Sequence, residues 1–299
     1  METKYIFLDD KKIERKQKIY AALTILIPIL VTIFTVININ EYLQFFTLNV
    51  ILFTLFYLLT TLGVSVGYHR LFAHKSYRPN RLTKIILAIM GSMSAQGPVI
   101  FWVATHRRHH TFSDKEGDVH SPNLSKNKLM GFFFSHVGWM LKSKVTNPVR
   151  FCKDLLKDQD ILILNKYYFV IVGAGIIVPG IISYSVYGNS HSFVEGVIWG
   201  GFIRMFAAHH ITWALNSFAH LVGKQNYKTG DFSNNIAFLS VISMGESWHN
   251  NHHAFPNSAL FGVDKGQLDP GFWFIKLLAR IGVADSIKLP KNKPAESIN

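Results

Sequence analysis

Four long runs of apolar residues divide the chain, with polar segments between them. The first, YAALTILIPILVTIFTVINI, begins at Tyr20, and the second runs from about Phe45 through VILFTLFYLLTTLGVSVGY. The third, YYFVIVGAGIIVPGIISYSVYG, begins at Tyr167, and the fourth, FVEGVIWGGFIRMFAAHHITWAL, begins at Phe193. A helix needs about 20 apolar residues to span a bilayer. The pattern therefore predicts an all-α integral membrane protein with four transmembrane helices.

The segments between these runs indicate how the chain is oriented. NEYLQ joins the first run to the second, GNSHS joins the third to the fourth, and neither contains Lys or Arg. Basic residues are instead frequent in the N-terminal arm, between Arg70 and Lys166, and after Lys224. Because such residues collect on the cytoplasmic side of membrane proteins, we expect both termini and the middle region to be cytoplasmic. The expected single domain, 1–299, has a basic arm (1–18), a helical hairpin (about 20–69), a cytosolic region (70–166), a second hairpin (about 167–220) and a cytosolic helical cap with a tail (221–299).

A fifth apolar segment, KIILAIMGSMSAQGPVIFWV at residues 84–103, also approaches the length of a span. SAQGP breaks its apolar run, and Pro98 would interrupt a helix there. If the segment crossed the membrane, it would place His106 on the opposite side from the preceding loop. We therefore expect it to lie in the membrane interface or partly embedded beside the bundle.

The amino-acid composition is consistent with a membrane protein whose basic regions are cytoplasmic, and it excludes several classes of function. Hydrophobic residues make up 49% of the 299 residues and charged residues 16%, whereas soluble domains carry about 25% charged residues. The net charge of +13 is explained by the basic cytoplasmic regions. Nucleic-acid binding is not expected, because the basic residues form no recognised reading motif. The one cysteine, Cys152, excludes an intrachain disulfide framework and cysteine-based metal sites. No cleavable signal is expected at the N-terminus.

Histidines recur with a ligand-like spacing at the cytoplasmic ends of the expected helices. WVATHRRHHTF and GESWHNNHHAF share the spacing H-x-x-H-H, HRLFAH follows the second apolar run, and NSFAH follows the fourth. These motifs supply the candidate metal ligands: His69, His74, His106, His109, His110, Asn216, His220, His249, His252 and His253. With the expected topology, all of them reach one place just below the membrane surface. We interpret this place as a metal site shared by the two H-x-x-H-H copies.

The number of imidazoles indicates two metal ions. Residues i, i+3 and i+4 share one face of a helix, so each H-x-x-H-H copy can point three imidazoles inward. His69 and His74 would be about 140° apart on an ideal helix and are expected to straddle a helix end. Nine imidazoles exceed the roughly four to six ligands of one first-row ion, so two ions with four or five nitrogens each are expected. Imidazole suits zinc, copper, iron and nickel, and the ligand type leaves the metal open.

Acidic residues near these histidines are candidates to orient the rings. Metal-bound histidines usually donate their other N–H to an acceptor such as a carboxylate, which makes Asp114, Asp118 and Glu246 possible partners. A solvated acidic loop explains Asp114, Glu116 and Asp118 equally well. Glu246 begins a single E-x-x-H motif, whereas soluble di-iron bundles need two, so that class is rejected.

The other histidines receive less weight. His120, His136 and His191 are expected to be ordinary hydrogen-bonding residues. His209 and His210 lie near membrane depth, where an ionisable residue is a functional candidate. Helix packing beside Arg204 explains them equally well.

The motifs HRLFAH, HRRHH, NSFAH and HNNHH, in this order, resemble the histidine boxes of membrane fatty-acyl desaturases, most closely the Δ9, stearoyl-CoA desaturase-like members. GFFFSHVGWM strengthens the match, which covers roughly residues 20–285. The resemblance implies a four-helix membrane bundle with a cytosolic cap that holds a di-iron centre. Its nine histidine ligands would be the nine histidines of the four motifs, and Asn216 would be linked to the metal through water.

The resemblance also implies an activity: O2-dependent introduction of a cis double bond, at C9, into a saturated acyl chain. Acid–base side chains cannot remove hydrogen from unactivated methylenes, so the reaction needs an oxidant derived from O2. The chain would lie in a long apolar tunnel, for which Tyr57, Thr61, Trp102 and Trp213 are candidates; for Tyr57 and Thr61, helix packing explains the sequence equally well. Electrons would come from a separate donor, a ferredoxin or a cytochrome b5, since no haem-binding HPGG-type motif is present.

Several alternatives stay open at this stage. Acyl-CoA is the favoured carrier, but WVATH offers only Val103, Ala104 and Thr105 where acyl-CoA members carry charged residues, so acyl-lipid and acyl-carrier-protein substrates are open. Arg78, Arg107 and Lys142 are candidates to hold phosphates. A fatty-acyl hydroxylase would share the ligand spacing. A metal transporter is disfavoured, because the ligands cluster on one side of the membrane. The short chain favours a bacterial inner membrane over the endoplasmic reticulum.

Overall fold

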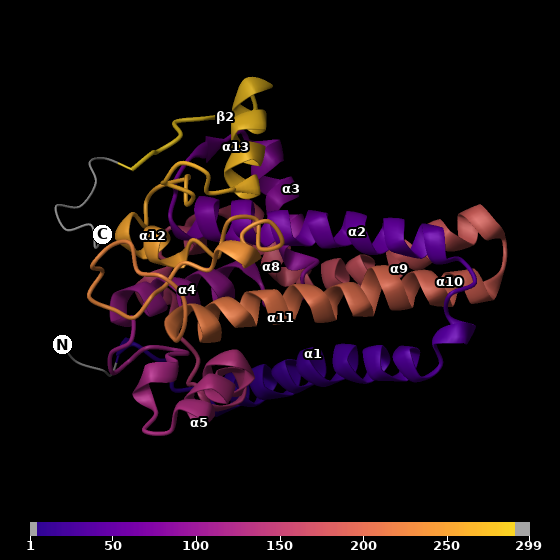
Figure 1. Ribbon diagram of the computed structural model, residues 1–299, viewed down its shortest axis with the longest axis horizontal. Helices are drawn as coiled ribbons and strands as arrows, with labels where there is room; N and C mark the ends of the chain where they lie inside the picture. The colour runs from indigo at the N-terminus through magenta and orange to yellow at the C-terminus, as the bar shows by residue number, and fades with distance from the viewer. Residues whose placement is uncertain (1–4, 291–299) are drawn as a thin grey trace.

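The computed structural model describes residues 5–290, and four long helical rods run along its longest axis (Figure 1). The first rod is α1 (Lys11–Ile37), and the third is α9 (Tyr168–Tyr187). The second is α2 (Phe46–Leu62) continued by a π-helix (Gly63–Ala73). The fourth joins α10 (Ser190–Gly196), a π-helix (Val197–Ile203) and α11 (Arg204–Ser217) without a break.

Local sequence signals determine where these rods begin and turn. The Asp10 carboxylate accepts hydrogen bonds from the backbone N–H groups of Lys12 and Ile13, which caps the start of α1. Gly188 ends α9 with a φ of 70°, a left-handed conformation that glycine adopts without steric cost. Asn189 follows directly and caps α10. The third and fourth rods are therefore joined by a tight turn, as the short polar segment GNSHS indicated.

Three rods are long and apolar enough to cross a membrane: Lys11–Ile37, Phe46–Ala73 and Tyr168–Tyr187. The fourth expected span is not among them, and it contains Arg204, His209 and His210. Arg204 is fully buried and donates to the carbonyl oxygens of Met93 and Gly175 at 3.1 and 2.9 Å. These bonds tie the fourth rod to its neighbours, so Arg204 has a packing role.

Shorter elements gather at one end of the rods. They are α3 (Arg81–Ser92), α4 (Val99–Phe112), α5 (Lys128–Phe133), a π-turn (Phe134–Gly138), α6 (Trp139–Lys142), α7 (Pro148–Phe151), α8 (Gln159–Lys166), α12 (His249–Ala254) and α13 (Pro270–Arg280). Two short strands, β1 (Arg78–Pro79) and β2 (Ala284–Asp285), pair antiparallel. Single 3-10 turns lie in or next to these elements at Pro122–Leu124, Leu155–Lys157, Phe218–His220 and Ala237–Leu239, whereas the 3-10 turn Ile39–Glu41 joins the first two rods at their opposite end. We call this assembly, residues 74–166 and 221–290, the cap.

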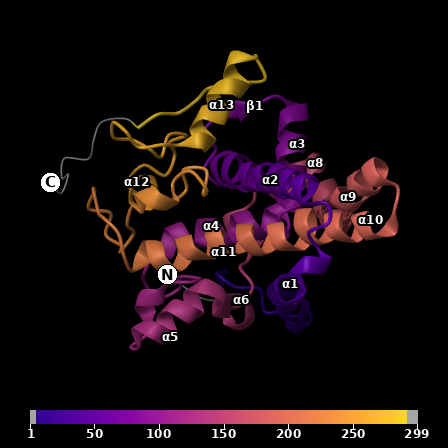
Figure 2. The same cartoon turned by 45° about the vertical axis from the view of Figure 1, so that its right-hand side comes forward.

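The interruption expected within residues 84–103 is present. α3 ends at Ser92, and α4 begins at Val99 with Pro98 at its N-cap. Both α3 and α13 run across the long rods in two views of the molecule (Figures 1 and 2). The described chain begins beside the cap and ends in it, since Phe7 pairs with Thr146 and the backbone N–H of Lys288 donates to the carbonyl oxygen of Ser76. The first and last described residues therefore lie on the same side of the bundle.

Candidate metal centre

The histidine motifs converge where the rods meet the cap. His69 lies in the π-helix at the end of the second rod, and His74 is its C-cap. The first H-x-x-H-H copy lies on α4 and the second on α12, while His220 lies in the 3-10 turn after α11. The backbone N–H of His74 donates to the carbonyl oxygen of His69, a bond across five residues. Because such bonds place residue i+5 above residue i, the π-helix brings together two rings that an ideal α-helix would separate.

The nine histidines form two clusters, each with ligand nitrogens within 4.8 Å of one another. The five-histidine cluster is His69, His74, His106, His110 and His252. The four-histidine cluster is His109, His220, His249 and His253. This division agrees with the prediction of four or five nitrogens for each of two ions. The i, i+4 pair of each H-x-x-H-H copy belongs to one cluster, and the i+3 histidine belongs to the other.

The distances between the nitrogens fit metal coordination. Nε2 of His74 lies 2.8 Å from Nε2 of His106, and Nε2 of His220 lies 2.9 Å from Nε2 of His249. With metal–nitrogen bonds of about 2.0–2.1 Å, ligands at right angles would be about 2.8–3.0 Å apart, and tetrahedral ligands about 3.3–3.4 Å apart. Among the described atoms, buried Nε2 of His109 and of His253 has no hydrogen-bond partner. These nitrogens are therefore available as metal ligands.

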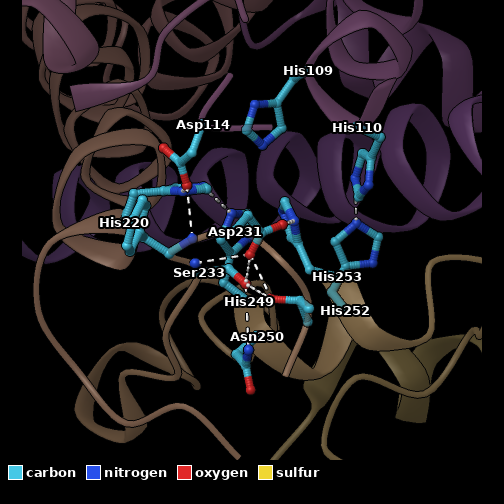
Figure 3. Close-up of polar contacts among 12 residues, drawn as sticks. His109, His110, Asp114, His220, Asp231, Ser233, His249, Asn250, His252 and His253 are labelled. Atoms are coloured by element: carbon cyan, nitrogen blue, oxygen red, sulfur yellow. Dashed lines mark hydrogen bonds and ion pairs between the residues drawn. The ribbon is translucent and has the colours of Figure 1, made fainter. Parts of the chain in front are cut away.

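Four carboxylates hold the opposite nitrogens of four histidines. Nδ1 of His109 contacts Asp118 at 2.9 Å, Nδ1 of His220 contacts Asp114 at 2.8 Å, and Nδ1 of His69 contacts Glu246. Nδ1 of His253 contacts Asp231 at 2.7 Å (Figure 3). A carboxylate that accepts the Nδ1–H fixes the tautomer and leaves Nε2 with its lone pair free. Asp114, Asp118 and Glu246 thus each contact a histidine, and their predicted role of orienting metal-bound rings stays a prediction. Glu116 is exposed.

Asp231 was not identified from the sequence. It lies in the loop segment TGDFS, where no helical period and no neighbouring histidine draws attention to it. Its Oδ1 accepts hydrogen bonds from the backbone N–H and the hydroxyl of Ser233 and from the hydroxyl of Thr229. The loop therefore fixes the carboxylate, and the carboxylate fixes His253.

A buried ion-pair network supports His69 from behind. Arg70 is completely buried and donates to Glu246 at 2.6 Å and to Asp269 at 2.9 Å. The guanidinium also lies over the ring of Phe261. Because a buried charge is costly unless it is paired, Arg70 needs both carboxylates. Glu246 in turn holds His69, so the network links Asp269 at the start of α13 to the metal site.

Burial keeps most of these imidazoles neutral. Desolvation, followed by repulsion from neighbouring histidines, lowers the pKa of His106, His110, His249 and His252 well below the usual value. Burial lowers the pKa of His253 to about 4, even though the bond to Asp231 opposes that change. A neutral imidazole is the form that binds metals. The protein therefore holds these rings in their ligand form at neutral pH.

Two adjacent cavities lie beside the clusters. They enclose about 750 and 660 Å³ of empty space, part of it open to solvent, and they share a set of lining residues. The shared residues are Gln96, Trp102, His106, His120, Thr212 and Asn216. The side-chain amide of Gln96 donates to the hydroxyl of Thr212 at 3.0 Å. Asn216 and Trp102 thus line both cavities together with His106, and the predicted roles of Asn216 at the metal and of Trp102 in the tunnel stay predictions.

The other tunnel candidates are distributed differently. Thr61 lines the smaller cavity, and Trp213 lines the larger one. Tyr57 lines neither of these two cavities, and its hydroxyl donates to the carbonyl oxygen of Ile242 at 2.7 Å. The tunnel roles remain predictions.

His120 was expected to be an ordinary hydrogen-bonding residue, and its position is more specific than that. Its ring stacks on His109 with 4.3 Å between centroids, and it lines both cavities. The spacing of His120 from the first H-x-x-H-H copy has no helical meaning, because a turn separates them. His209 and His210 stay outside both clusters: His209 contacts the carbonyl oxygen of Ser94 at 2.7 Å, and His210 pairs with His136 at 3.1 Å.

The residues suggested for phosphate binding are partly engaged elsewhere. All five N–H groups of Arg107 are used, by both carboxylate oxygens of Asp154 and by three backbone carbonyl oxygens. Arg78 pairs with Asp285 at 2.8 Å on the surface. Lys142 is exposed. Arg107 therefore has no hydrogen left to donate to a phosphate.

Comparison with known proteins identifies the family. The model for the fatty acid desaturase family matches residues 45–264. The chain is 40% identical to a hex-5-enoyl-(acyl-carrier protein) acetylenase of Moorena producens (strain JHB), over 80% of this chain and 76% of that protein. It is 35% identical to an sn-1 stearoyl-lipid 9-desaturase of Anabaena variabilis, over 80% of this chain and 83% of the relative. It is 38% identical to Delta-9 acyl-lipid desaturase 1 of Arabidopsis thaliana, over 77% of this chain and 72% of that protein. The two histidine clusters, the carboxylates behind them and these matches together show that the chain belongs to the membrane fatty acid desaturase family.

Proposed function

We propose that this protein is an O2-dependent desaturase that introduces a cis double bond, at C9, into a saturated acyl chain. The observation that carries the proposal is the pair of histidine clusters, whose members line two adjacent cavities beside the rods. The two clusters would each hold one non-haem iron ion. The Δ9 position is supported by the names of the Anabaena and Arabidopsis relatives.

The iron pair, when bound, would activate O2, which is the oxidant that takes two hydrogens from the methylenes and, with two electrons and two protons, ends as water. The residues of the chain then have three tasks. Asp114, Asp118, Asp231 and Glu246 keep the proton of their histidine on Nδ1, so that Nε2 faces the cluster. The cavity walls hold the acyl chain against the clusters and exclude bulk water. Gln96, hydrogen-bonded to Thr212, joins α11 to the segment before α4 and fixes the cavity wall beside His106.

A membrane lipid is the carrier that the observations favour, although the sequence alone favoured acyl-CoA. Arg107 is engaged with Asp154 and offers no grip for a nucleotide. The larger cavity is lined by Tyr20, Ala21 and Thr24, which lie within the membrane-spanning candidate α1, so an acyl chain can approach from the bilayer. Acyl-lipid substrates also appear in the names of several relatives.

The proposed topology has four spans with both termini and the metal centre on the cytoplasmic side. The unbroken fourth rod runs beside the other three (Figure 1), and buried Arg204 is satisfied by carbonyl oxygens of neighbouring segments. An external protein, a ferredoxin or a cytochrome b5, would supply electrons. Since such donors tend to be acidic, the basic cap would attract them.

The test is the fatty-acid profile of cells that express the protein, analysed by gas chromatography–mass spectrometry with double-bond location. A new C9 monoene is expected, and it should be absent from a His249→Ala, His253→Ala variant. His191→Ala is the matched control, because His191 lies far from the clusters and contacts the carbonyl oxygen of Glu41. A hydroxy acid in place of the alkene would assign the protein to the hydroxylase class instead.

The carrier is tested with purified, iron-loaded protein in proteoliposomes. Deuterated distearoyl-phosphatidylcholine and deuterated stearoyl-CoA are supplied separately with the same electron donor. Desaturation of the lipid-bound chain is expected. Turnover of stearoyl-CoA alone would return the assignment to acyl-CoA.

A further inference from the structure

Helix α13 is amphipathic, and no described segment covers its outer face. Its inner side is buried at Gly271, Ile275 and Leu278. Its outer side carries three large apolar residues at helical spacing, with exposures of 53%, 50% and 61%: Trp273, Leu277 and Ile281. Two exposed basic residues flank this stripe, Lys276 and Arg280. An apolar stripe with an aromatic residue and basic neighbours is typical of a helix that lies in a membrane interface.

The orientation of α13 suits that position. It runs across the long rods in both views, as does α3 (Figures 1 and 2). Both helices pack against the π-helix that ends the second rod, so both are at the boundary between rods and cap. α3 also exposes apolar residues one turn apart, Leu82 and Ile86. Two helices therefore lie crosswise where an apolar bundle meets a basic cap, and each presents apolar side chains outward.

We propose that α13 is a lipid-binding helix that seats the C-terminal part of the cap on an anionic bilayer surface. Trp273, Leu277 and Ile281 would enter the head-group boundary. Lys276 and Arg280 would extend their charged ends to lipid phosphates, while their alkyl stems stay on the apolar side. The bilayer is the occupant because α13 packs against the π-helix that ends a membrane-spanning candidate, and the outer residues of that candidate, such as Leu55, are also exposed and apolar.

The helix is joined to the candidate metal centre through its N-cap residue, Asp269. The Asp269 carboxylate caps α13 by accepting the backbone N–H of Phe272 at 2.9 Å, and it also accepts from Arg70 at 2.9 Å. Arg70 binds Glu246, which holds His69 of the five-histidine cluster. The segment between Glu246 and Asp269 includes α12 and its three ligands. Seating α13 on lipid therefore fixes one end of the segment that carries the second H-x-x-H-H copy.

Site-directed spin labelling tests the position of the helix. A nitroxide is attached at Leu277→Cys in the full-length protein, reconstituted in bilayers of phosphatidylcholine and phosphatidylglycerol. Its relaxation by O2, which partitions into lipid, is compared with relaxation by a water-soluble nickel chelate. Leu55→Cys provides the lipid-exposed control and Lys265→Cys the water-exposed control, since both residues are exposed. Wild-type protein gives the background, because Cys152 is fully buried.

The label at Leu277 is expected to show O2 relaxation near that of Leu55 and nickel relaxation severalfold below that of Lys265. Nickel relaxation equal to that of Lys265 would overturn the proposal. So would exclusion of both reagents with dipolar broadening between labels, which indicates a second copy of the chain on this face. A water-exposed Leu55 would instead overturn the four-span topology of the proposed function, so the two failures are distinguishable.

The basic residues are tested in the same system. Lys276→Gln combined with Arg280→Gln should raise nickel relaxation of the Leu277 label severalfold in bilayers that contain phosphatidylglycerol. It should have little effect in pure phosphatidylcholine, because only the anionic surface attracts the charges. Lys265→Gln is the matched control. Equal effects in both bilayers would contradict an electrostatic contribution.

Discussion

Replacing Asp231 by Asn is expected to remove metal from the four-histidine cluster while leaving the five-histidine cluster loaded. The exchange is nearly isosteric, but it replaces one acceptor oxygen by a donor nitrogen. Oδ2 of Asp231 accepts from His253 at 2.7 Å, and Oδ1 accepts three hydrogen bonds from Ser233 and Thr229. The carboxylate is 7% exposed, so water cannot replace a lost partner.

Neither orientation of the asparagine amide satisfies both sides of the site. If the amide nitrogen faces His253, two donors meet, and the ring must place its proton on Nε2, where it blocks metal binding. If the amide is turned, the nitrogen faces the backbone N–H of Ser233, again donor against donor. Removal of the partner of a metal-bound histidine typically lowers metal affinity about 10–100-fold. That loss is about 1.4–2.7 kcal/mol, and the forced donor–donor contact places this variant toward its upper end.

The assay is iron content after dialysis against chelators of increasing strength. Asp231→Asn is expected to retain half of the wild-type iron under conditions in which the wild type retains all. Glu246→Gln should likewise lose half, but from the cluster that contains His69. Asp285→Asn controls for loss of a carboxylate, because Asp285 lies on the surface beside Arg78. If Asp231→Asn kept both ions with wild-type affinity, the carboxylate would not be orienting His253 and the reasoning would be refuted.

Two further predictions concern the cavity wall and a tight turn. Thr61→Ala should shift the product profile toward longer acyl chains and Thr61→Leu toward shorter ones, by about tenfold in the ratio of palmitoyl to stearoyl products, because Thr61 lines the smaller cavity. An unchanged profile for both variants would exclude Thr61 from the tunnel end. Gly245→Ala should destabilise the protein by about 3 kcal/mol, measured by thermal unfolding in detergent, because φ is +87° and the new Cβ would lie 2.2 Å from Oδ1 of Asp269. Gly266→Ala is the matched control, since it has the same φ sign but no atom within 4 Å; equal losses would show that the Asp269 contact is unimportant.

Local chemistry in the sequence was sufficient for much of the fold. Apolar runs predicted the rods because each span must satisfy its own backbone and face lipid. Pro98 and the SAQGP segment predicted the break between α3 and α4. The sequence also predicted a fourth membrane span, and the fourth rod is present as a helix but is not among the three candidates for crossing a membrane. Arg204 within it is satisfied by the carbonyl oxygens of Gly175 and Met93, which lie far away in sequence and could not be identified from spacing.

In the candidate metal centre, the spacing of residues along the sequence predicted the histidines but not the contacts that depend on loops. The nine histidines were found because helices impose a spacing on ligands. The positions of Asp231 and of His120, which stacks on His109, are set by loops. In a loop, the spacing along the sequence does not indicate where a side chain points. The closeness of His69 and His74 depends on a π-helix, whose extra residue per turn changes which side chains share a face. An ideal α-helix would place the rings of His69 and His74 on different sides, so helical spacing does not predict that they are neighbours.

The way the clusters divide the histidines explains why the chain carries H-x-x-H-H twice. On α4 the i, i+4 pair, His106 and His110, belongs to the five-histidine cluster, and His109 belongs to the four-histidine cluster. On α12 the assignment is reversed: the i, i+4 pair belongs to the four-histidine cluster, and His252 belongs to the other. A helix with only H-x-x-x-H could supply two ligands to one ion and none to its neighbour. The additional histidine at i+3 lets each helix contribute to both clusters, so each helix fixes the position of one cluster relative to the other.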